Sequence, residues 1–291
     1  GGTFQSIESR DSQYSLRGAR RLTRSSAVIE RSSNEYLLGQ FVARKEWDTL
    51  VFTSATGIVG QDITETYDAT QPGNIPELFR QRSRISLISS ENRLTQSLDD
   101  GSSWIVGTSL VRNRYRLNRQ FGAITLASAI AGVSNGMDEA TLYGEVTKAV
   151  TPSLNLTAGG RVTHARLSGA ALDAPSALLA SAARLQGQRN ETEFLPSLSA
   201  TYAVGDGLTL FAKYQESFRP GGIVVRNELI QRYRNDQVYA AEIGLRFGSR
   251  GAPAVDGSLS VSRTLWRNIQ ADLIDASGLP ATSNIGTGRI W

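Results

Sequence analysis

The residues best equipped for chemistry in this chain are arginines, and the most suggestive one lies in the stretch YQESFRPGGI. Arg219 ends an alternating, strand-like pattern and is followed by Pro220 and two glycines. A guanidinium group presents a planar set of N–H donors that matches anionic oxygens. Proline cannot donate to a sheet ladder, and glycine adopts backbone conformations closed to other residues, so we expect the strand to end here in a loop. Arg219 is then either a contact for an anionic ligand or a solvated loop residue.

Other chemistries have little support in the composition. The chain has no cysteine and one histidine, His164. A thiol nucleophile, a disulfide framework and a Cys/His zinc site are therefore excluded. His164 lies within a strand pattern, without the GxSxG turn that a serine hydrolase would place nearby. We predict that the protein is not an enzyme and holds neither a catalytic metal nor a cofactor.

The basic character of the chain also has a simple interpretation. Lysine and arginine together number 31 against 27 acidic residues, and only Lys45, Lys148 and Lys213 are lysines. A nucleic-acid-binding surface gathers its cations into a patch. The arginines here are spread through every segment, so nucleic acid is not an expected partner.

The elements that must position these residues are strands, because the hydrophobic period is two almost throughout. Leu208, Leu210, Ala212 and Tyr214 alternate with Thr209, Phe211, Lys213 and Gln215. Strands of about 10 residues exceed the usual mode of five or six, and about 10 tilted residues cross a bilayer. The pattern predicts strands near 3–9, 13–23, 35–56, 82–97, 103–116, 138–150, 154–167, 191–203, 207–217, 237–248, 256–266 and 284–291.

Short and long connections alternate along the chain. Tight turns are predicted at 99–101, 151–153 and 205–207, and a slightly longer one at 248–257. The intervening polar segments are long: 59–81, 115–137, 168–190, 218–236 and 267–283. Only 175–186 has a helical pattern. Short turns on one rim and long loops on the other are typical of an outer-membrane barrel.

No apolar run approaches the roughly 18 residues of a transmembrane helix. A membrane barrel shows no such run either, because apolar lipid-facing and polar lumen-facing residues alternate along its strands. Two other all-β classes share the period of two. Soluble sandwiches and propellers have shorter strands, and no 40-residue propeller repeat is evident. The pattern therefore favours a membrane barrel.

Several ordered motifs carry a family resemblance. They are LTLFAKYQESFRPGGI, YRNDQVYAAEIGLR, LWRNIQADLI and NIG, and, upstream of them, SLISSENRLTQSLDDGSSWIVGTSLV and YGEVTKAVTPSLNLTAGGRV. In order and spacing they resemble the barrel of TonB-dependent receptors of Gram-negative outer membranes. The resemblance covers most of 14–291. It is specific for the family and does not identify a solute.

The resemblance implies an all-β fold, an antiparallel up-and-down transmembrane barrel with short periplasmic turns and long extracellular loops. Residues 1–291 would form one incomplete barrel, about a dozen of 22 strands. The plug domain, the TonB-contacting segment and the closing strands would lie outside it. Residues at the outer rim and loops would contact the ligand: Arg219, Gly221, Gly222, Tyr233 and Arg234. Lumen-facing residues would contact the plug or the ligand: Arg161, Lys213, Gln215, Glu242 and Arg246.

The function implied is TonB-energised uptake of a scarce solute across the outer membrane, by default a ferric siderophore. Its partners would be outer-membrane lipid, the TonB complex and the plug. Cobalamin, haem, nickel chelates and oligosaccharides stay open as solutes. The alternatives from other classes are a passive diffusion porin, which lacks a plug, and a soluble β-rich binding domain.

Overall fold

The computed structural model describes residues 1–11, 25–173, 187–205, 207–226, 229–248, 256–274 and 280–291. Within these ranges every regular element is a strand, and no helix is long and apolar enough to span a membrane. The predicted strand 13–23 and the predicted helical segment 175–186 both lie entirely outside the described residues.

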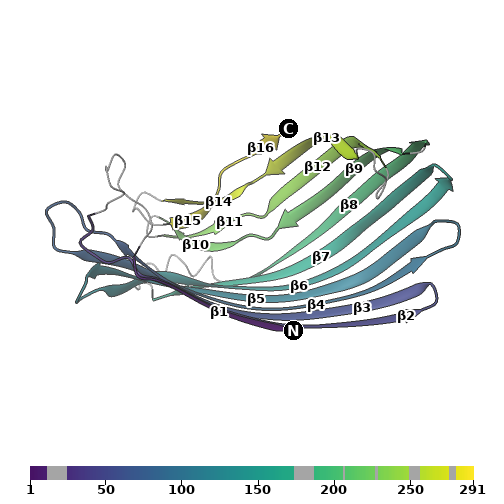
Figure 1. Ribbon diagram of the computed structural model, residues 1–291. Coiled ribbons are helices and arrows are strands. Elements are labelled where there is room, and N and C mark those ends of the chain that lie inside the picture. Colours follow the sequence, from purple (N-terminus) through teal and green to yellow (C-terminus); the bar gives the residue numbers. More distant parts are fainter. Residues whose placement is uncertain (12–24, 174–186, 206, 227–228, 249–255, 275–279) are drawn as a thin grey trace.

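Twelve strands form one antiparallel sheet in which nearly every strand pairs with its neighbour in the sequence (Figure 1). Two small hairpins, β10–β11 and β14–β15, are inserted between strands of this sheet. The strands of the large sheet are β1 (Gly2–Ser9), β2 (Ser32–Trp47), β3 (Leu50–Asp68), β4 (Glu77–Ser97), β5 (Ser103–Ala123), β6 (Ser128–Thr151), β7 (Leu154–Leu172), β8 (Gly187–Gly205), β9 (Leu208–Arg219), β12 (Asp236–Phe247), β13 (Gly257–Arg267) and β16 (Gly288–Ile290). The hairpin strands are β10 (Gly222–Arg226), β11 (Leu229–Tyr233), β14 (Gln270–Ile274) and β15 (Pro280–Asn284).

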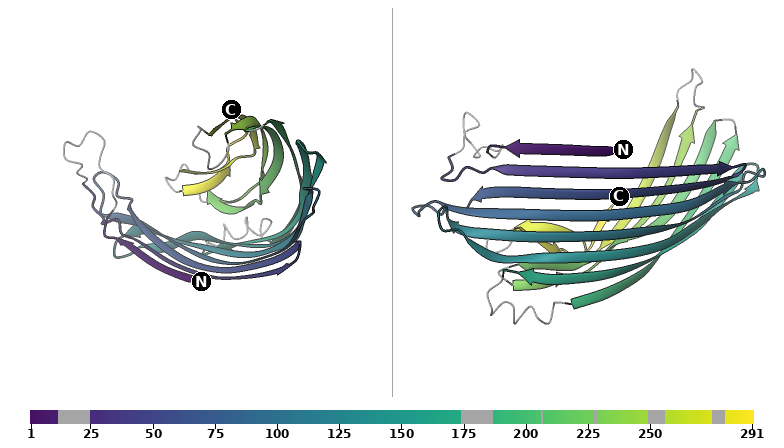
Figure 2. Two further views of the ribbon diagram at one scale, coloured as in Figure 1. Left: turned by 45° about the vertical axis from the view of Figure 1, so that its right-hand side comes forward. Right: turned by 90° about the horizontal axis from the view of Figure 1, so that it is seen from below.

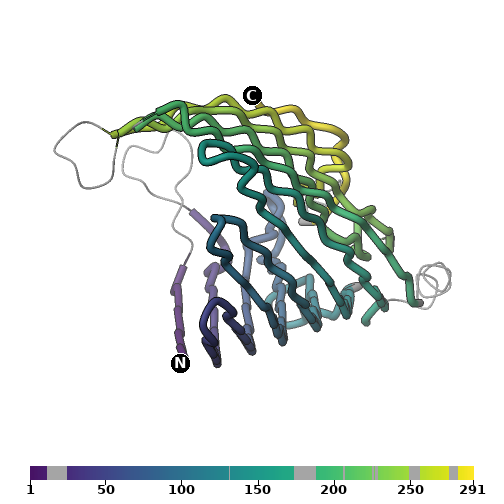
Figure 3. Tube along the Cα trace, turned by 90° about the vertical axis from the view of Figure 1, so that its right-hand side faces the viewer, coloured from purple at the N-terminus to yellow at the C-terminus, as the bar shows by residue number. Residues whose placement is uncertain are grey.

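The large sheet curls into an open trough (Figure 2, Figure 3). Its order runs from β1 at one edge to β16 at the other, and those two strands are not paired with each other. The all-β, up-and-down, incomplete barrel predicted from the sequence is therefore confirmed.

The two faces of the sheet differ in chemistry. Side chains alternate between faces along a strand, and the inner hairpin β10–β11 contacts Tyr115 and Leu117, which places odd-numbered residues of β5 on the concave face. The opposite, convex face carries exposed apolar side chains on successive strands. They include Phe41, Ile58, Ile88, Leu110, Leu142, Val162, Phe194, Leu210, Ile243 and Val261. Such an outward apolar band is the surface that a membrane barrel presents to lipid.

One predicted strand is wrong: 35–56 is two strands, β2 and β3, joined by a hairpin at Asp48 and Thr49. Asp48 has φ of 46°. Aspartate tolerates this left-handed region better than most residues. Because the turn contains neither glycine nor proline, the sequence pattern predicts one continuous strand where the structure has two.

The long connections predicted from polarity are also too long. The ladder of β3 and β4 runs on to Asp68 and Leu78, and that of β5 and β6 runs on to Phe121 and Ser128. The predicted loops 218–236 and 267–283 contain the hairpins β10–β11 and β14–β15. Above the apolar band both faces of a strand meet water, so polar residues continue to pair there, and polarity alone does not mark the end of a strand.

The small hydrophobic core lies on the concave side. Leu117 of β5 and Val133 of β6 pack against Ile223 and Ile230 of the β10–β11 hairpin. The hairpin therefore docks on the inner wall near the rim that carries the longer connections (Figure 2).

Candidate functional site

A cluster of four residues, which we call the rim cluster, ties the end of β9 to the inserted hairpins: Arg219, Asp236, Trp266 and Gln270. The Asp236 side chain is 3% exposed. Its Oδ2 accepts from Arg219 Nη2 at 2.7 Å and from the Trp266 indole N–H at 3.1 Å. A buried carboxylate requires such partners, since an unpaired charge out of water is costly. Trp266 lies on the concave side of the sheet, opposite Val238 of β12.

Gln270 is the second anchor of the rim cluster and is 9% exposed. Its side-chain amide N–H groups donate to three backbone carbonyls, those of Arg219, Pro220 and Arg234, at 3.3, 3.0 and 3.0 Å. Both ends of the segment that carries the β10–β11 hairpin are thus fixed by one side chain. The abrupt stop of β9 at Arg-Pro-Gly-Gly is the start of this fixed insertion.

The two glycines after Pro220 are needed for close packing. A Cβ on Gly221 would overlap the Tyr233 carbonyl oxygen, and a Cβ on Gly222 would overlap the Tyr233 ring. Neither glycine has a positive φ. The reason expected from the sequence, a special backbone conformation, is therefore wrong, and the close approach of β10 to β11 replaces it.

Tyr233 and Arg234 end the hairpin differently. Burial raises the pKa of the Tyr233 phenol above its ordinary value. The Arg234 backbone N–H donates to Asn284 Oδ1 at 2.7 Å, while its side chain is exposed. Within the ranges that the structure describes, the Arg234 guanidinium has no hydrogen bond or ion pair, whereas the Arg234 backbone is fixed by hydrogen bonds.

The hairpin is clamped to the inner wall from the far side as well. Asn135 of β6 donates through Nδ2 to the Ile223 carbonyl at 2.9 Å and accepts the Ile223 N–H through Oδ1 at 3.1 Å. A cavity of about 580 Å³ lies between the wall and the two hairpins, and Arg219, Gly221, Gly222 and Tyr233 contribute to its lining. The volume is within the range of small-ligand sites.

The lumen-facing set lies elsewhere. By register, Lys213 stands opposite Glu242, and Gln215 stands opposite Ala240, on the concave face of β9 and β12. The Arg246 guanidinium lies 4.9 Å from the centre of the Phe211 ring, a cation–π distance. Arg161 lies on the same face of β7, opposite Tyr143.

The structure does not join the two predicted sets. None of the lumen-facing residues lines the cavity that the rim residues share. Contacts of either set with a ligand or a plug stay predictions. No role is predicted from the sequence for Asp236, Asn135 or Gln270. The one feature of the sequence that could have pointed to the rim cluster is Asp236, the aspartate of the YRNDQVY motif.

Among the described residues, no group of three or more His, Cys, Asp or Glu side chains is close enough to hold a metal ion.

Comparison with known proteins decides the family. The protein-family model described as TonB dependent receptor-like, beta-barrel matches residues 4–291 of this chain. The chain belongs to this family. Members of the family are transporters and receptors of the outer membrane, which places the convex apolar band in lipid.

Solved structures of TonB-dependent receptors share the fold. The ferric yersiniabactin uptake receptor FyuA from Yersinia pestis superposes with a TM-score of 0.70 at 15% identity, over 85% of this chain and 38% of that one. The ferric citrate transporter FecA in its unliganded form gives 0.70 at 14% identity, over 99% and 43%. The ferripyoverdine receptor of Pseudomonas aeruginosa gives 0.67 at 15% identity, over 93% and 40%. The chain thus spans about two fifths of these receptors. No curated protein matches it.

Proposed function

We propose that this chain is one part of the barrel wall of a receptor that takes up a ferric siderophore with energy from the TonB complex. The support is the family, together with structural neighbours whose names specify ferric chelates. The plug and the TonB-contacting segment would belong to other parts of the receptor. A copper transporter, OprC, is also among the neighbours, so the metal is itself open to test.

The observation that carries the proposal is the fixed hairpin over the concave wall. The rim cluster and Asn135 hold β10–β11 from both sides, so its side chains are presented without a large ordering cost on binding. A ferric siderophore is a bulky chelate that is often anionic, and the exposed Arg234 beside the half-buried Tyr233 suits it. Lys213, Glu242, Arg161 and Arg246, deeper in the trough, would contact the plug.

The test uses the complete receptor in its own cells. A deletion strain and the complemented strain are grown under iron limitation and supplied with siderophores loaded with radioactive iron. We expect uptake of one siderophore that depends on the receptor gene and on TonB. Uptake that persists without TonB would identify a passive porin. Uptake of chelated copper and not of iron would reassign the solute.

The site is tested by substituting Arg234, whose hairpin contacts come from its backbone. We expect Arg234→Ala to weaken siderophore binding about tenfold while leaving the fold intact. The matched control is Arg267→Ala on the convex face of β13, where the guanidinium lies over Tyr239. Equal binding by both variants would remove Arg234 from the site and leave the transport proposal standing.

A further inference from the structure

Besides its apolar band, the convex face holds a group of charged side chains that neither the barrel fold nor the uptake site requires. Arginines project outward at every second position of two paired strands, β4 and β5. We call them, with the two carboxylates beside them, the outer basic patch. Its members are Arg80, Arg82 and Arg84 of β4, Arg112, Arg114 and Arg116 of β5, Asp62 of β3 and Asp138 of β6.

The outer basic patch lies on the lipid-facing side. Tyr115 and Leu117 point to the concave hairpin, so Arg114 and Arg116 point the opposite way. Cross-strand partners lie on the same face of a sheet. Arg84, opposite Arg116, and Asp62, opposite Arg84, therefore also lie on the convex face. All the arginines of the patch are exposed.

The height of the patch matches the edge of the hydrocarbon layer. A tilted strand needs about 10 residues to cross it. Counted from the short-turn ends of β4 and β5, at Ser97 and Ser103, that span is used up close to Leu87 and Arg112. The arginines begin at this level and continue toward the long connections. They therefore stand where the headgroups of the outer leaflet lie.

The charges within the patch do not cancel. Asp62 is shared by Arg82 and Arg84, at 2.6 and 3.0 Å, and Asp138 by Arg112 and Arg114, at 2.7 and 2.8 Å. Each carboxylate offsets one of its two arginines. Glu35 of β2, opposite Asp62 on the same face, adds a third negative charge near Arg82, so the six arginines still leave a net positive charge. In the described part of the chain, Arg116 has neither an ion pair nor a hydrogen bond.

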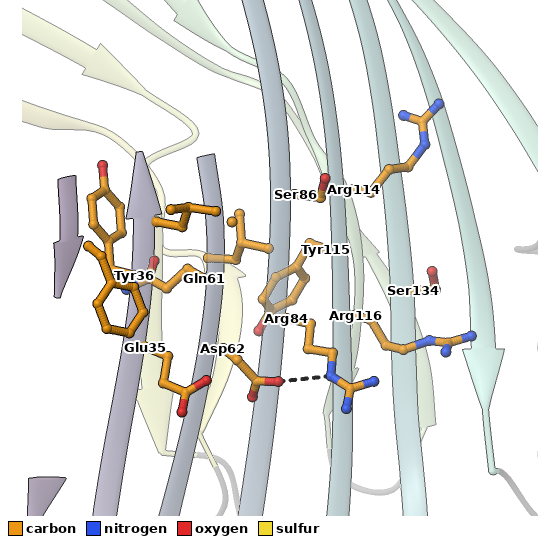
Figure 4. A pocket seen from close by; sticks show the side chains of 14 residues that line it. Glu35, Tyr36, Gln61, Asp62, Arg84, Ser86, Arg114, Tyr115, Arg116 and Ser134 are labelled. Carbon is orange, nitrogen blue, oxygen red and sulfur yellow. Dashed lines mark hydrogen bonds and ion pairs between the residues drawn. The ribbon is translucent and has the colours of Figure 1, made fainter. Parts of the chain in front are cut away.

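The strongest argument for an anion-binding site is that Arg84 and Arg116 are directly opposed. They are cross-strand partners in the β4–β5 ladder. Like charges in this arrangement destabilise a sheet. Figure 4 shows Asp62, Arg84 and Arg116 in a row on neighbouring strands, with only the first two joined. An anion between the two guanidinium groups would relieve the repulsion through charge-assisted hydrogen bonds.

An open depression of about 510 Å³ adjoins these arginines. Its lining includes the small residues Gly60 and Ser86, the apolar side chains of Phe4 and Leu37, and the carboxylates of Glu35 and Asp62. Arg84, Arg114 and Arg116 supply the basic part of the lining (Figure 4). Below it, toward the short turns, Ile58 and Ile88 continue the apolar band. A basic side and an apolar side in one groove match a molecule with an anionic head and a hydrocarbon tail.

We propose that this groove binds a phosphate-bearing lipid of the outer leaflet of the outer membrane. A lipid phosphate lies between Arg84 and Arg116. An acyl chain runs down over Phe4, Leu37 and Ile58. The ligand is a lipid and not free phosphate, because the phosphate position is continuous with apolar surface.

The test measures lipid retained by the complete receptor purified in mild detergent. Receptor is mixed with bis-phosphorylated lipid A or with its dephosphorylated form, and bound lipid is counted by native mass spectrometry. We expect retention of the phosphorylated form, reduced about tenfold or more in Arg84→Gln/Arg116→Gln, as for the loss of charge-assisted hydrogen bonds. The single variant Arg116→Gln breaks no ion pair, so it tests the site even where the double variant folds poorly.

The matched control is Arg44→Gln/Arg93→Gln. Arg44 of β2 and Arg93 of β4 flank Thr53 on the concave face. Substituting both removes the same amount of positive charge as the double variant on the convex face. Retention in the control should equal that of the unchanged receptor. An equal loss in both double variants would show a bulk charge effect and overturn the proposal, as would equal retention of dephosphorylated lipid or displacement of the lipid by inorganic phosphate alone. None of these readouts depends on siderophore uptake.

Discussion

At the scale of single residues, Asp236 is the most constrained side chain of the rim cluster. Its carboxylate is almost fully buried and accepts from Arg219 and Trp266. Asp236→Asn keeps the size and loses the charge, so Arg219 loses its ion pair. Because Arg219 is itself 54% exposed and can be rehydrated, we expect a loss of about 1–3 kcal/mol in the free energy of unfolding, measured by urea unfolding of the receptor in detergent.

The control for this prediction is Asp272→Asn. Asp272 is exposed and accepts from Thr282 Oγ1 at 2.6 Å in the β14–β15 hairpin. Its substitution should change the free energy of unfolding by no more than about 0.5 kcal/mol. Similar effects at the two positions would mean that the burial of Asp236 contributes nothing to stability.

At the scale of elements, the docking of β10–β11 depends on one side chain of the wall. Asn135→Ala removes both of its hydrogen bonds to the Ile223 backbone. We expect the Ile223 amide to exchange with solvent about tenfold faster, since the hairpin opens locally more often. Asn34→Ala on β2, which removes the acceptor of a hydrogen bond from Gln61 of β3, is the control and should leave this amide unchanged. Unchanged exchange in Asn135→Ala would show that apolar packing alone holds the hairpin.

The short turn between β4 and β5 gives a pH dependence. Lys148 donates to Asp100 at 2.7 Å and lowers the pKa of that carboxyl from its ordinary 3.8 to about 2. A depressed folded pKa stabilises the fold above the unfolded pKa, and that stability is lost as the pH falls from about 4 to 2. In Asp100→Asn this part of the acid sensitivity should disappear, measured as the slope of unfolding free energy against pH. Asp99→Asn, one residue away, should keep the slope of the unchanged protein.

Elements and site were predictable from the sequence to different degrees. The period of two in β9 and β12 reflects burial in lipid on one face, a strong local signal, so strand type was predictable. The hairpin at Asp48 was not, because its turn has no glycine or proline. The rim cluster was not either. Asp236 and Gln270 are 34 residues apart, and they meet only because the registers of β9, β12 and β13 bring their strand ends to one point.

At the scale of the whole molecule, the wall is much taller than a membrane. β4 has 21 residues, about twice the roughly 10 residues that a tilted strand needs to cross the hydrocarbon core. Short turns stand at one end, and the hairpins and the outer basic patch stand toward the other. A single strand therefore passes, along its length, through the lipid, the headgroup layer and the aqueous vestibule.

The open edges of the sheet lead to the last prediction. β1 and β16 each pair with one neighbour only. Lipid cannot satisfy the free backbone groups of an edge strand, and closed barrels avoid that cost. The 291-residue chain refolded alone with lipid vesicles should therefore stay sensitive to protease, whereas the complete receptor under the same conditions becomes protected. A protected dimer would mean that copies pair their edges, in agreement with this argument. A protected monomer would contradict it, because the chain would then satisfy both edges by itself.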